Sequence, residues 1–142
     1  MRYLGLDLGT KTLGLSTSLN ESGLVTPLPV LRWDGENYNL LFKELDNIIE
    51  NKKIDILVLG LPKNMNNSLG FASDRSLKFK EELDSRYHKE VVLVDERLTT
   101  VEAENYLISL DTSRKKRKEK IDSVAACIIL ETYLRMRRKS NE

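Results

Sequence analysis

The 142-residue sequence contains very few of the residues on which several enzyme classes depend. It has one histidine, His88, and one cysteine, Cys127. A single cysteine cannot form an internal disulfide, and because Cys127 lies in an apolar helical run, we expect a buried structural thiol. These counts argue against Ser-His-Asp catalysis and the usual Cys/His zinc sites, and against Cys-His catalysis unless His88 takes part. Acidic side chains are the remaining candidates for catalysis.

The sequence also lacks a long apolar run and an excess of charge of either sign. No run reaches the length of a signal peptide or a membrane span, so we expect a cytoplasmic protein that does not contact the membrane. The 23 Lys and Arg residues against 22 Asp and Glu residues give a net charge of +1, so any affinity for nucleic acid must come from local clusters. With 40% hydrophobic and 32% charged residues, the chain suits one domain over residues 1–142 with a single core.

The first half of the sequence predicts three strands, followed by a helix and a buried strand. Strands over residues 2–8 and 13–18 are separated by a short glycine-containing link, which predicts a hairpin. A third strand within residues 24–33 contains two prolines, which cannot donate to a ladder and therefore place part of this strand at a sheet edge. Apolar residues at helical spacing follow over residues 38–49, and the continuous apolar run IDILVLGLP is typical of a parallel strand covered on both faces.

The second half of the sequence predicts a further alternation of helices and strands. We expect a helix over residues 72–85, a strand over residues 91–94 and a last helix over residues 119–137. Thr99-x-x-Glu102 is a capping-box pattern that predicts the start of another helix. Three strands in meander order followed by β-α-β-α units predict an α/β domain with a mixed five-stranded sheet flanked by helices.

Three acidic residues on separate elements form the candidate site. Asp7 lies in the first strand and Glu96 directly follows the fifth, and functional groups gather at the carboxyl ends of parallel strands. Asp122 begins the last helix, where helical spacing puts it on the apolar face. Small Ala125 and Ala126 on that face allow the helix to approach the sheet closely. We therefore expect the three carboxylates to converge.

Each of these acids also has a purely structural interpretation. Asp122 could be a helix N-cap, Glu96 could pair with Arg97, and Asp7 could accept backbone N–H groups of the turn at Gly9. Three like charges in one site, however, repel each other unless a divalent cation lies between them. A charged Asp7 in a buried strand likewise needs a cation, hydrogen-bond donors or solvent, because burial of a lone carboxylate is costly.

Four segments of the sequence resemble the YqgF-type family, in the family's order: LGLDLGTKTLGLS, GLPKNMNNS, VDERLTTVEAE and KIDSVAACIILETYL. The resemblance covers nearly the whole chain and implies a ribonuclease H-like fold. Proteins of this family are described as pre-16S ribosomal RNA nucleases and as Holliday junction resolvases, so the resemblance implies a hydrolase that cleaves phosphodiester bonds. The family's acidic residues fall on Asp7, Glu96 and Asp122, which the resemblance thereby marks as catalytic and metal-binding.

The donor set and the departures from the family pattern bear on cofactor and substrate. Carboxylate oxygens without histidine suit Mg²⁺ or Mn²⁺, and either one ion or a pair about 3.5–4 Å apart would serve phosphodiester hydrolysis.

The sequence departs from the family pattern at three places. Thr12 stands where the family often has Arg, and Ser18-Leu19 stands where Ser-Asp is common; both changes concern the rim of the site and hence substrate preference. Asn66-Asn67 replaces Asp-Gly or Asn-Gly, a mild change because Asn tolerates left-handed conformations.

Basic and polar residues provide candidate contacts to the phosphates of RNA or branched DNA. Six of the seven residues 114–120 are basic, directly before Asp122, and we expect them to form a substrate-binding loop. A solvated charge run is the alternative, and it is what we expect for the basic C-terminal tail. Loops at strand ends commonly carry binding residues. The predicted substrate-binding residues are Lys11, Lys63, Asn64, Asn67, Arg97, Arg114, Lys115, Lys116, Arg117 and Lys118.

Two other classes of function stay open from the sequence. The stretch GLDLGTKTLG also resembles the phosphate-binding hairpin of the actin, Hsp70 and sugar-kinase ATPases, but those proteins place nucleotide between two related lobes and this chain has residues for one. A catalytically silent nucleic-acid-binding domain is the other alternative, and the complete set of three acids argues against it. A Holliday junction would require two active sites, normally from a dimer, and the sequence leaves monomer and homodimer open.

Overall fold

The computed structural model of the chain describes residues 1–20, 24–62, 70–95 and 114–140, and for residues 71–72, 114–122 and 138–140 it describes the backbone alone. No helix in these described ranges is long and apolar enough to cross a membrane. The elements follow in the order β1 (Tyr3–Leu8), β2 (Thr12–Ser18), β3 (Thr26–Arg32), α1 (Asn39–Asn51), β4 (Ile56–Leu61), α2 (Phe71–Tyr87), β5 (Glu90–Asp95) and α4 (Arg114–Ser140).

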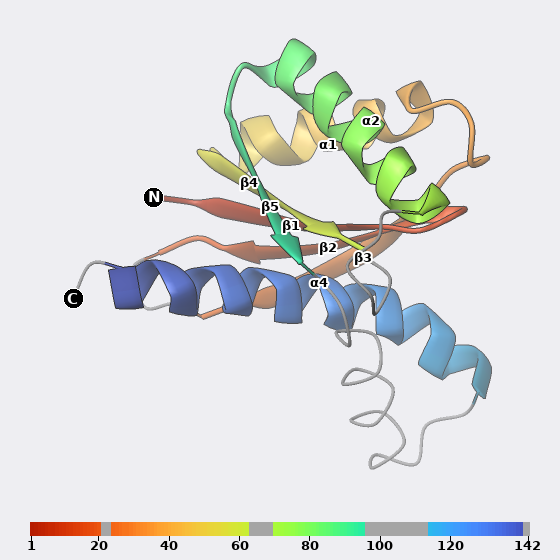
Figure 1. Cartoon of the computed structure of the whole chain (residues 1–142). Coiled ribbons are helices and arrows are strands. Elements are labelled where there is room, and N and C mark those ends of the chain that lie inside the picture. The colour runs from red at the N-terminus through yellow and green to blue at the C-terminus, as the bar shows by residue number, and fades with distance from the viewer. Residues whose placement is uncertain (21–23, 63–69, 96–113, 141–142) are drawn as a thin grey trace.

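The five strands form one mixed sheet in the order β3-β2-β1-β4-β5. β1 pairs antiparallel with β2, and β2 with β3, whereas β4 lies parallel between β1 and β5. Helices α1 and α2 cover one face of this sheet, and α4 crosses the other (Figure 1). The predicted hairpin, the five strands and the flanking helices are therefore confirmed, and the two prolines lie on an edge strand, β3, as predicted.

The alternation of side chains along β1 divides the core into two parts. Leu4, Leu6 and Leu8 pack with residues of α1 and α2 in one buried cluster. Tyr3 packs against α4 in a second cluster. All six residues of β4 are buried, which explains why its sequence is continuously apolar rather than alternating. By the same alternation, Asp7 lies on the face of the sheet that α4 crosses.

Helix α4 comes very close to the sheet at Gly5. A Cβ atom added to Gly5 would overlap Ser16 Oγ and would lie 2.9 Å from the Ala126 carbonyl oxygen and 3.0 Å from Leu130 Cβ. Ser16 Oγ donates a 2.8 Å hydrogen bond to that same carbonyl oxygen. Ala125 and Ala126 are buried, with exposed fractions of 1% and 0%. The prediction that small residues let this helix approach the sheet closely is confirmed.

Two predictions about the last helix are wrong. α4 begins at Arg114 rather than near Glu119, so the basic run 114–118 is the first part of a helix and not a loop. Lys and Arg are good helix formers, and no proline or glycine interrupts the run. Cys127 is half-buried rather than fully buried, because it lies beside the stripe of α4 that faces the sheet. The helix start predicted at Thr99 and Glu102 lies outside the described residues.

Candidate active site

Asp7, near the carboxyl end of β1, is the predicted catalytic residue whose side chain the structure describes. It is half-buried and pairs across β1 and β2 with Gly14. On the other side Leu6 pairs with Leu59, which puts Gly60 beside Asp7 one step further along β4. The carboxylate therefore lies in a row with a glycine on each neighbouring strand, and neither glycine carries a side chain that would fill the space around it.

The packing of α4 on β1 sets the register between Asp7 and this helix. The rings of Tyr3 and Tyr133 meet edge to face with centroids 5.8 Å apart, and Gly5 lies against Ala126. Two residues along a strand advance about 7 Å, and four residues along a helix advance about 6 Å. The next turn of α4 toward its start contains residue 122, and in this turn Ser123 Oγ donates a 3.2 Å hydrogen bond to the Leu28 carbonyl of β3, so the helix crosses the sheet from β1 toward the edge strand. The side chain of Asp122 lies outside the described atoms, so its role stays a prediction.

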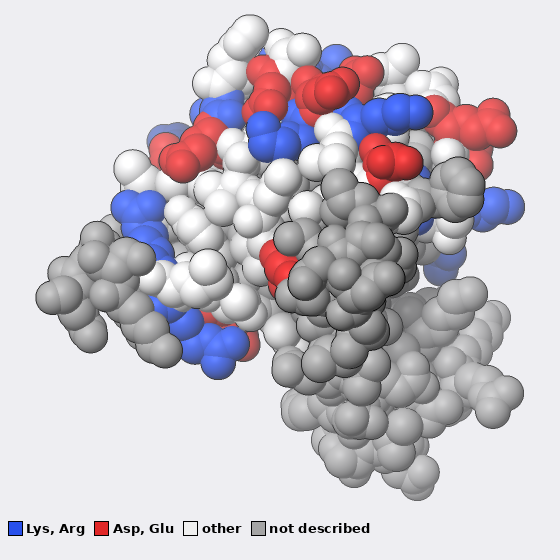
Figure 2. All heavy atoms as spheres, in the orientation of Figure 1, with Lys and Arg blue, Asp and Glu red and all other residues white. Residues whose placement is uncertain are grey.

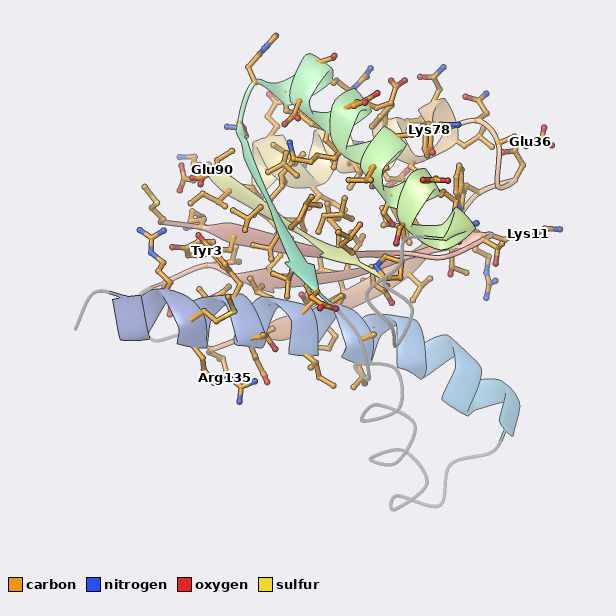
Figure 3. All side chains as sticks on the ribbon, viewed as in Figure 1. Tyr3, Lys11, Glu36, Lys78, Glu90 and Arg135 are labelled. Atoms are coloured by element: carbon orange, nitrogen blue, oxygen red, sulfur yellow. The ribbon has the colours of Figure 1, made fainter. Side chains whose placement is uncertain are left out.

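The turn between β1 and β2 presents Lys11 at the same edge of the sheet. The backbone N–H of Gly9 donates to the carbonyl of Thr12 (2.8 Å) and closes the turn. Trp33 holds the turn from the side, because its backbone N–H donates to the Lys11 carbonyl (3.1 Å) and its indole Nε1–H donates to the Gly9 carbonyl (3.2 Å). Lys11 itself is exposed and projects from the end of the hairpin (Figure 3).

Arg32 also lies at this edge, although it is absent from the predicted set. It is exposed at the end of β3 and is the cross-strand partner of Thr12, next to Lys11. The signal in the sequence is the spacing of Leu28 and Leu31, which pack on the same core although they are three residues apart. Such spacing indicates an irregularity in the strand that changes the face of every later residue.

The remaining predicted site residues are described in part or lie outside the described ranges. Position 122 and the basic run 114–118 have a described backbone, in α4. Glu96, Arg97, Lys63, Asn64 and Asn67 lie outside the described residues. Among the side chains that are described, no group of three or more His, Cys, Asp or Glu residues is placed to hold a metal ion. Asp7 is thus the described member of the predicted set of three carboxylates.

Neither Cys127 nor His88 lies in an environment that activates a nucleophile. Burial and a nearby carboxylate raise the pKa of the Cys127 thiol to about 11, so the thiol is protonated at neutral pH. His88 is exposed and ends α2 in a left-handed conformation. A protonated thiol on α4 is a poor nucleophile at neutral pH.

The described charges over α2 are mixed in sign. Figure 2 shows Lys and Arg side chains interspersed with Asp and Glu side chains over this helix. One such pair is the 2.7 Å contact between Lys80 Nζ and Asp84 Oδ2. Interspersed charges give little net attraction for phosphates. The edge that holds Asp7 and Lys11, and not the surface of α2, is therefore the better candidate for binding nucleic acid.

Comparison with known proteins identifies a family and a fold. The family model described as "RuvX: Holliday junction resolvase" matches residues 1–136. Relatives from Geobacillus kaustophilus (strain HTA426) and Geobacillus sp. (strain WCH70) are both named "Putative pre-16S rRNA nuclease". The first is 46% identical over 139 residues, which cover 97% of this chain and 100% of the relative. The second is 44% identical over 134 residues, which cover 94% of this chain and 97% of the relative.

Solved structures of resolvases share the fold. RuvC of Thermus thermophilus in complex with a Holliday junction substrate has a TM-score of 0.58 at 13% identity and covers 96% of both chains. The fowlpox virus resolvase in complex with Holliday junction DNA has a TM-score of 0.54 at 13% identity and covers 94% of this chain and 96% of that chain. These likenesses confirm the predicted ribonuclease H-like architecture. The match over residues 1–136 and the relatives at 44% and 46% identity show that the chain belongs to the RuvX family, which is the YqgF-type family that its sequence resembles.

Proposed function

We propose that this protein is a metal-dependent nuclease that hydrolyses phosphodiester bonds, and that it acts in the cytoplasm in the processing of pre-16S rRNA. The observation that carries the proposal is the half-buried carboxylate of Asp7, flanked by glycines at the carboxyl edge of the sheet in a chain of the RuvX family. Relatives at 44% and 46% identity bear a name that refers to pre-16S rRNA, which supports RNA as the substrate.

Resolution of Holliday junctions is the second candidate function. The description of the family model and the fold shared with RuvC and the fowlpox virus resolvase favour it. Cutting a junction needs two active sites, so this function predicts a homodimer. Processing of a precursor RNA needs one active site and is compatible with a monomer. The oligomeric state in solution therefore separates the two candidates in part.

The residues that would hold one or two Mg²⁺ or Mn²⁺ ions are Asp7, Glu96 and Asp122. Carboxylate oxygens are the ligands that these ions prefer. The glycines on either side of Asp7 have no side chains that would compete with an ion for its carboxylate, so the donor chemistry of the described part of the site fits this cofactor. The ions would supply an activated water and would stabilise the leaving oxygen.

Two features of the backbone support the convergence of the other two acids on Asp7. Residue 122 of α4 lies one helical turn from Ala126, which lies against Gly5, two residues before Asp7 on β1. In β5, Val92 and Val94 belong to the cluster on the α4 face. Continued alternation by two residues would put position 96 on that face as well. All three acids would then lie on one face of the sheet at its carboxyl edge.

The predicted basic and polar residues would bind the phosphates on either side of the cleaved bond. Lys11 projects from the end of the hairpin that follows Asp7, and the run 114–118 begins the helix that crosses the face of the sheet on which Asp7 lies. Phosphate contacts of this kind orient a strand without reading its bases. Lys63, Asn64, Asn67 and Arg97 are proposed for the same role on the strength of their positions in the sequence alone.

A substrate panel tests the proposal. Purified protein would be incubated with precursor 16S rRNA, single strands, duplexes and a four-way junction, in Mg²⁺, in Mn²⁺ and in EDTA. We expect cleavage of the precursor RNA with either ion and none in EDTA, because the carboxylates alone supply no activated water. Cleavage of the junction alone would select the second candidate. Binding without cleavage under every condition would contradict a nuclease of either kind.

A further inference from the structure

Strand β3 contains a β-bulge shortly before its end. Upstream of the bulge, Leu28 pairs with Leu15, and downstream of it, Leu31 pairs with Leu13. β3 therefore has two residues between its paired leucines where β2 has one, Gly14. An extra residue of this kind bends an edge strand and changes the direction of the side chains that follow it.

The bulge decides the face on which Arg32 lies. Leu28 and Leu31 both pack on the cluster formed with α1 and α2, although strict alternation would put residues three apart on opposite faces. Arg32 follows Leu31 and pairs with Thr12, so it lies on the opposite face, which is also the face of Asp7. Without the bulge, Arg32 would fall on the face of the apolar cluster, where an unpaired charge is costly.

Trp33 fixes the end of β3 to the turn that carries Lys11. Its backbone N–H and its indole N–H donate to the carbonyls of Lys11 and Gly9 at 3.1 and 3.2 Å. The indole has an exposed fraction of 6% and stacks on Tyr38, with ring centroids 5.0 Å apart. A buried side chain and two hydrogen bonds therefore fix the backbone positions of Lys11 and Arg32 relative to each other.

The spacing between Arg32 and Asp7 suits phosphates that lie a few nucleotides apart on one strand. β3 lies two strand spacings from β1, about 10 Å, and Thr12 lies two residues beyond Gly14, about 7 Å along β2. The Cα atoms of Asp7 and Arg32 are therefore about 12 Å apart, which corresponds to about three or four stacked nucleotides at 3.4 Å each. Asp34, two residues after Arg32, is the carboxylate that follows in the sequence. It accepts 2.8 Å hydrogen bonds from the backbone N–H groups of Glu36 and Asn37 in its own loop.

We propose that Lys11 and Arg32 form a phosphate-binding rim that holds the single strand of nucleic acid next to the cleaved bond. Arg32 would donate paired hydrogen bonds to phosphate oxygens, as guanidinium groups do. Lys11 would contribute a point charge at the tip of the hairpin. Trp33 positions both residues and touches no phosphate itself. The proposal rests on the proposed nuclease function, and it adds to that function a binding residue on the third strand of the sheet.

Binding of a single-stranded oligonucleotide, followed by fluorescence anisotropy in EDTA over a range of salt concentrations, tests the rim. Arg32→Ala should make the slope of log affinity against log salt shallower by about 0.7, the contribution of one phosphate contact in a single strand. If the affinities are equal at 1 M salt, this slope gives binding about fourfold weaker at 0.15 M salt. Arg32→Gln should behave like Arg32→Ala, and Arg32→Lys should keep the wild-type slope because it keeps the charge.

Arg135→Ala provides the matched control. Arg135 is an exposed arginine near the other end of the molecule, far from Lys11 (Figure 3), and its loss should change neither slope nor affinity. Trp33→Phe keeps an aromatic ring on Tyr38 but removes the hydrogen bond to Gly9, so it should raise KM and leave kcat unchanged. Trp33 is also the one tryptophan of the chain, and its fluorescence should respond to the oligonucleotide in wild type and much less in Lys11→Ala.

The outcomes separate this proposal from the function on which it rests. Equal slopes and affinities for wild type, Arg32→Ala and Arg32→Gln would overturn the rim, even if the wild-type protein cleaves RNA normally. A wild-type protein that neither binds nor cleaves any nucleic acid would instead overturn the proposed nuclease function. A shallower slope in both neutral variants, with the wild-type slope kept in Arg32→Lys and Arg135→Ala, supports the rim.

Discussion

Replacement of Gly5 by alanine should destabilise the protein, although the same change at an uncrowded position would stabilise it. Alanine restricts the unfolded chain more than glycine does, which favours the folded state by about 0.4–1 kcal/mol. At Gly5, however, the new methyl group would overlap Ser16 Oγ and lie 2.9 Å from the carbonyl oxygen of Ala126. That oxygen belongs to the backbone of α4 and cannot rotate away, so the helix must move off the sheet.

The expected loss of stability in Gly5→Ala combines two destabilising effects in the folded state with one stabilising effect that acts through the unfolded state. Overpacking of a buried contact costs about 1–3 kcal/mol, and loss of the hydrogen bond between Ser16 and Ala126 costs about 1 kcal/mol. After subtraction of the gain in the unfolded state, the free energy of unfolding should fall by about 1–3.6 kcal/mol. For a chain of 142 residues, about 3 °C per kcal/mol gives a decrease in Tm of about 3–11 °C.

Thermal unfolding followed by circular dichroism measures this decrease. The double variant Gly5→Ala/Ser16→Ala is the control, because removal of the hydroxyl relieves one of the overlaps. Its loss of stability should be smaller than the sum of the two single losses, as expected for residues in contact. A Gly5→Ala protein as stable as wild type, or more stable, would refute the close approach of α4 to β1 and with it the register that supports the proposed site.

Backbone strain, acid and alkylation give three further predictions. Lys53, just after α1, has a φ of 53°, so Lys53→Gly should raise the stability by about 0.5–1 kcal/mol in thermal unfolding. Hydrogen bonds from Arg86 and Tyr87 lower the pKa of Asp46 to about 2, so they stabilise the fold above pH 4 and this contribution is lost as the pH falls from about 4 to 2. Urea unfolding over that range should show a smaller loss in Asp46→Asn than in wild type. With a pKa of about 11, Cys127 should react slowly with iodoacetamide at pH 8 and faster as the pH rises, and rapid reaction at pH 7 would contradict its partial burial.

Much of the fold could be predicted because its signals are local. The apolar run of β4 has no alternation since both faces of the strand are covered, and this pattern is visible in the sequence. The prolines of β3 mark an edge strand for an equally local reason. The start of α4 was not predictable in this way, because a run of Lys and Arg suits an exposed loop and an exposed helix equally well.

The candidate site was predictable where it depends on one element and less so where it depends on the pairing of two. The alternation of β1 identifies the face of Asp7, and the small residues Ala125 and Ala126 indicate the close approach of α4. The face of Arg32 depends on a bulge, which shifts the register between β2 and β3 and is set by how both strands pack. Cys127 was misjudged because an apolar run does not reveal which of its residues lie beside the buried stripe.

The catalytic role of Asp7 is tested by the rate of cleavage under single-turnover conditions in Mg²⁺, compared between wild type, Asp7→Asn and Asp84→Asn. Asp84 lies in a partly buried pair with Lys80 on α2, so its change to Asn is the matched loss of a carboxylate away from the site. If Asp7 holds a catalytic ion, Asp7→Asn should lower the rate by orders of magnitude and keep the fold and thermal stability of wild type. Asp84→Asn should cleave like wild type, and EDTA should abolish cleavage by both active proteins. Cleavage by Asp7→Asn at the wild-type rate, or cleavage that resists EDTA, would contradict this role of Asp7.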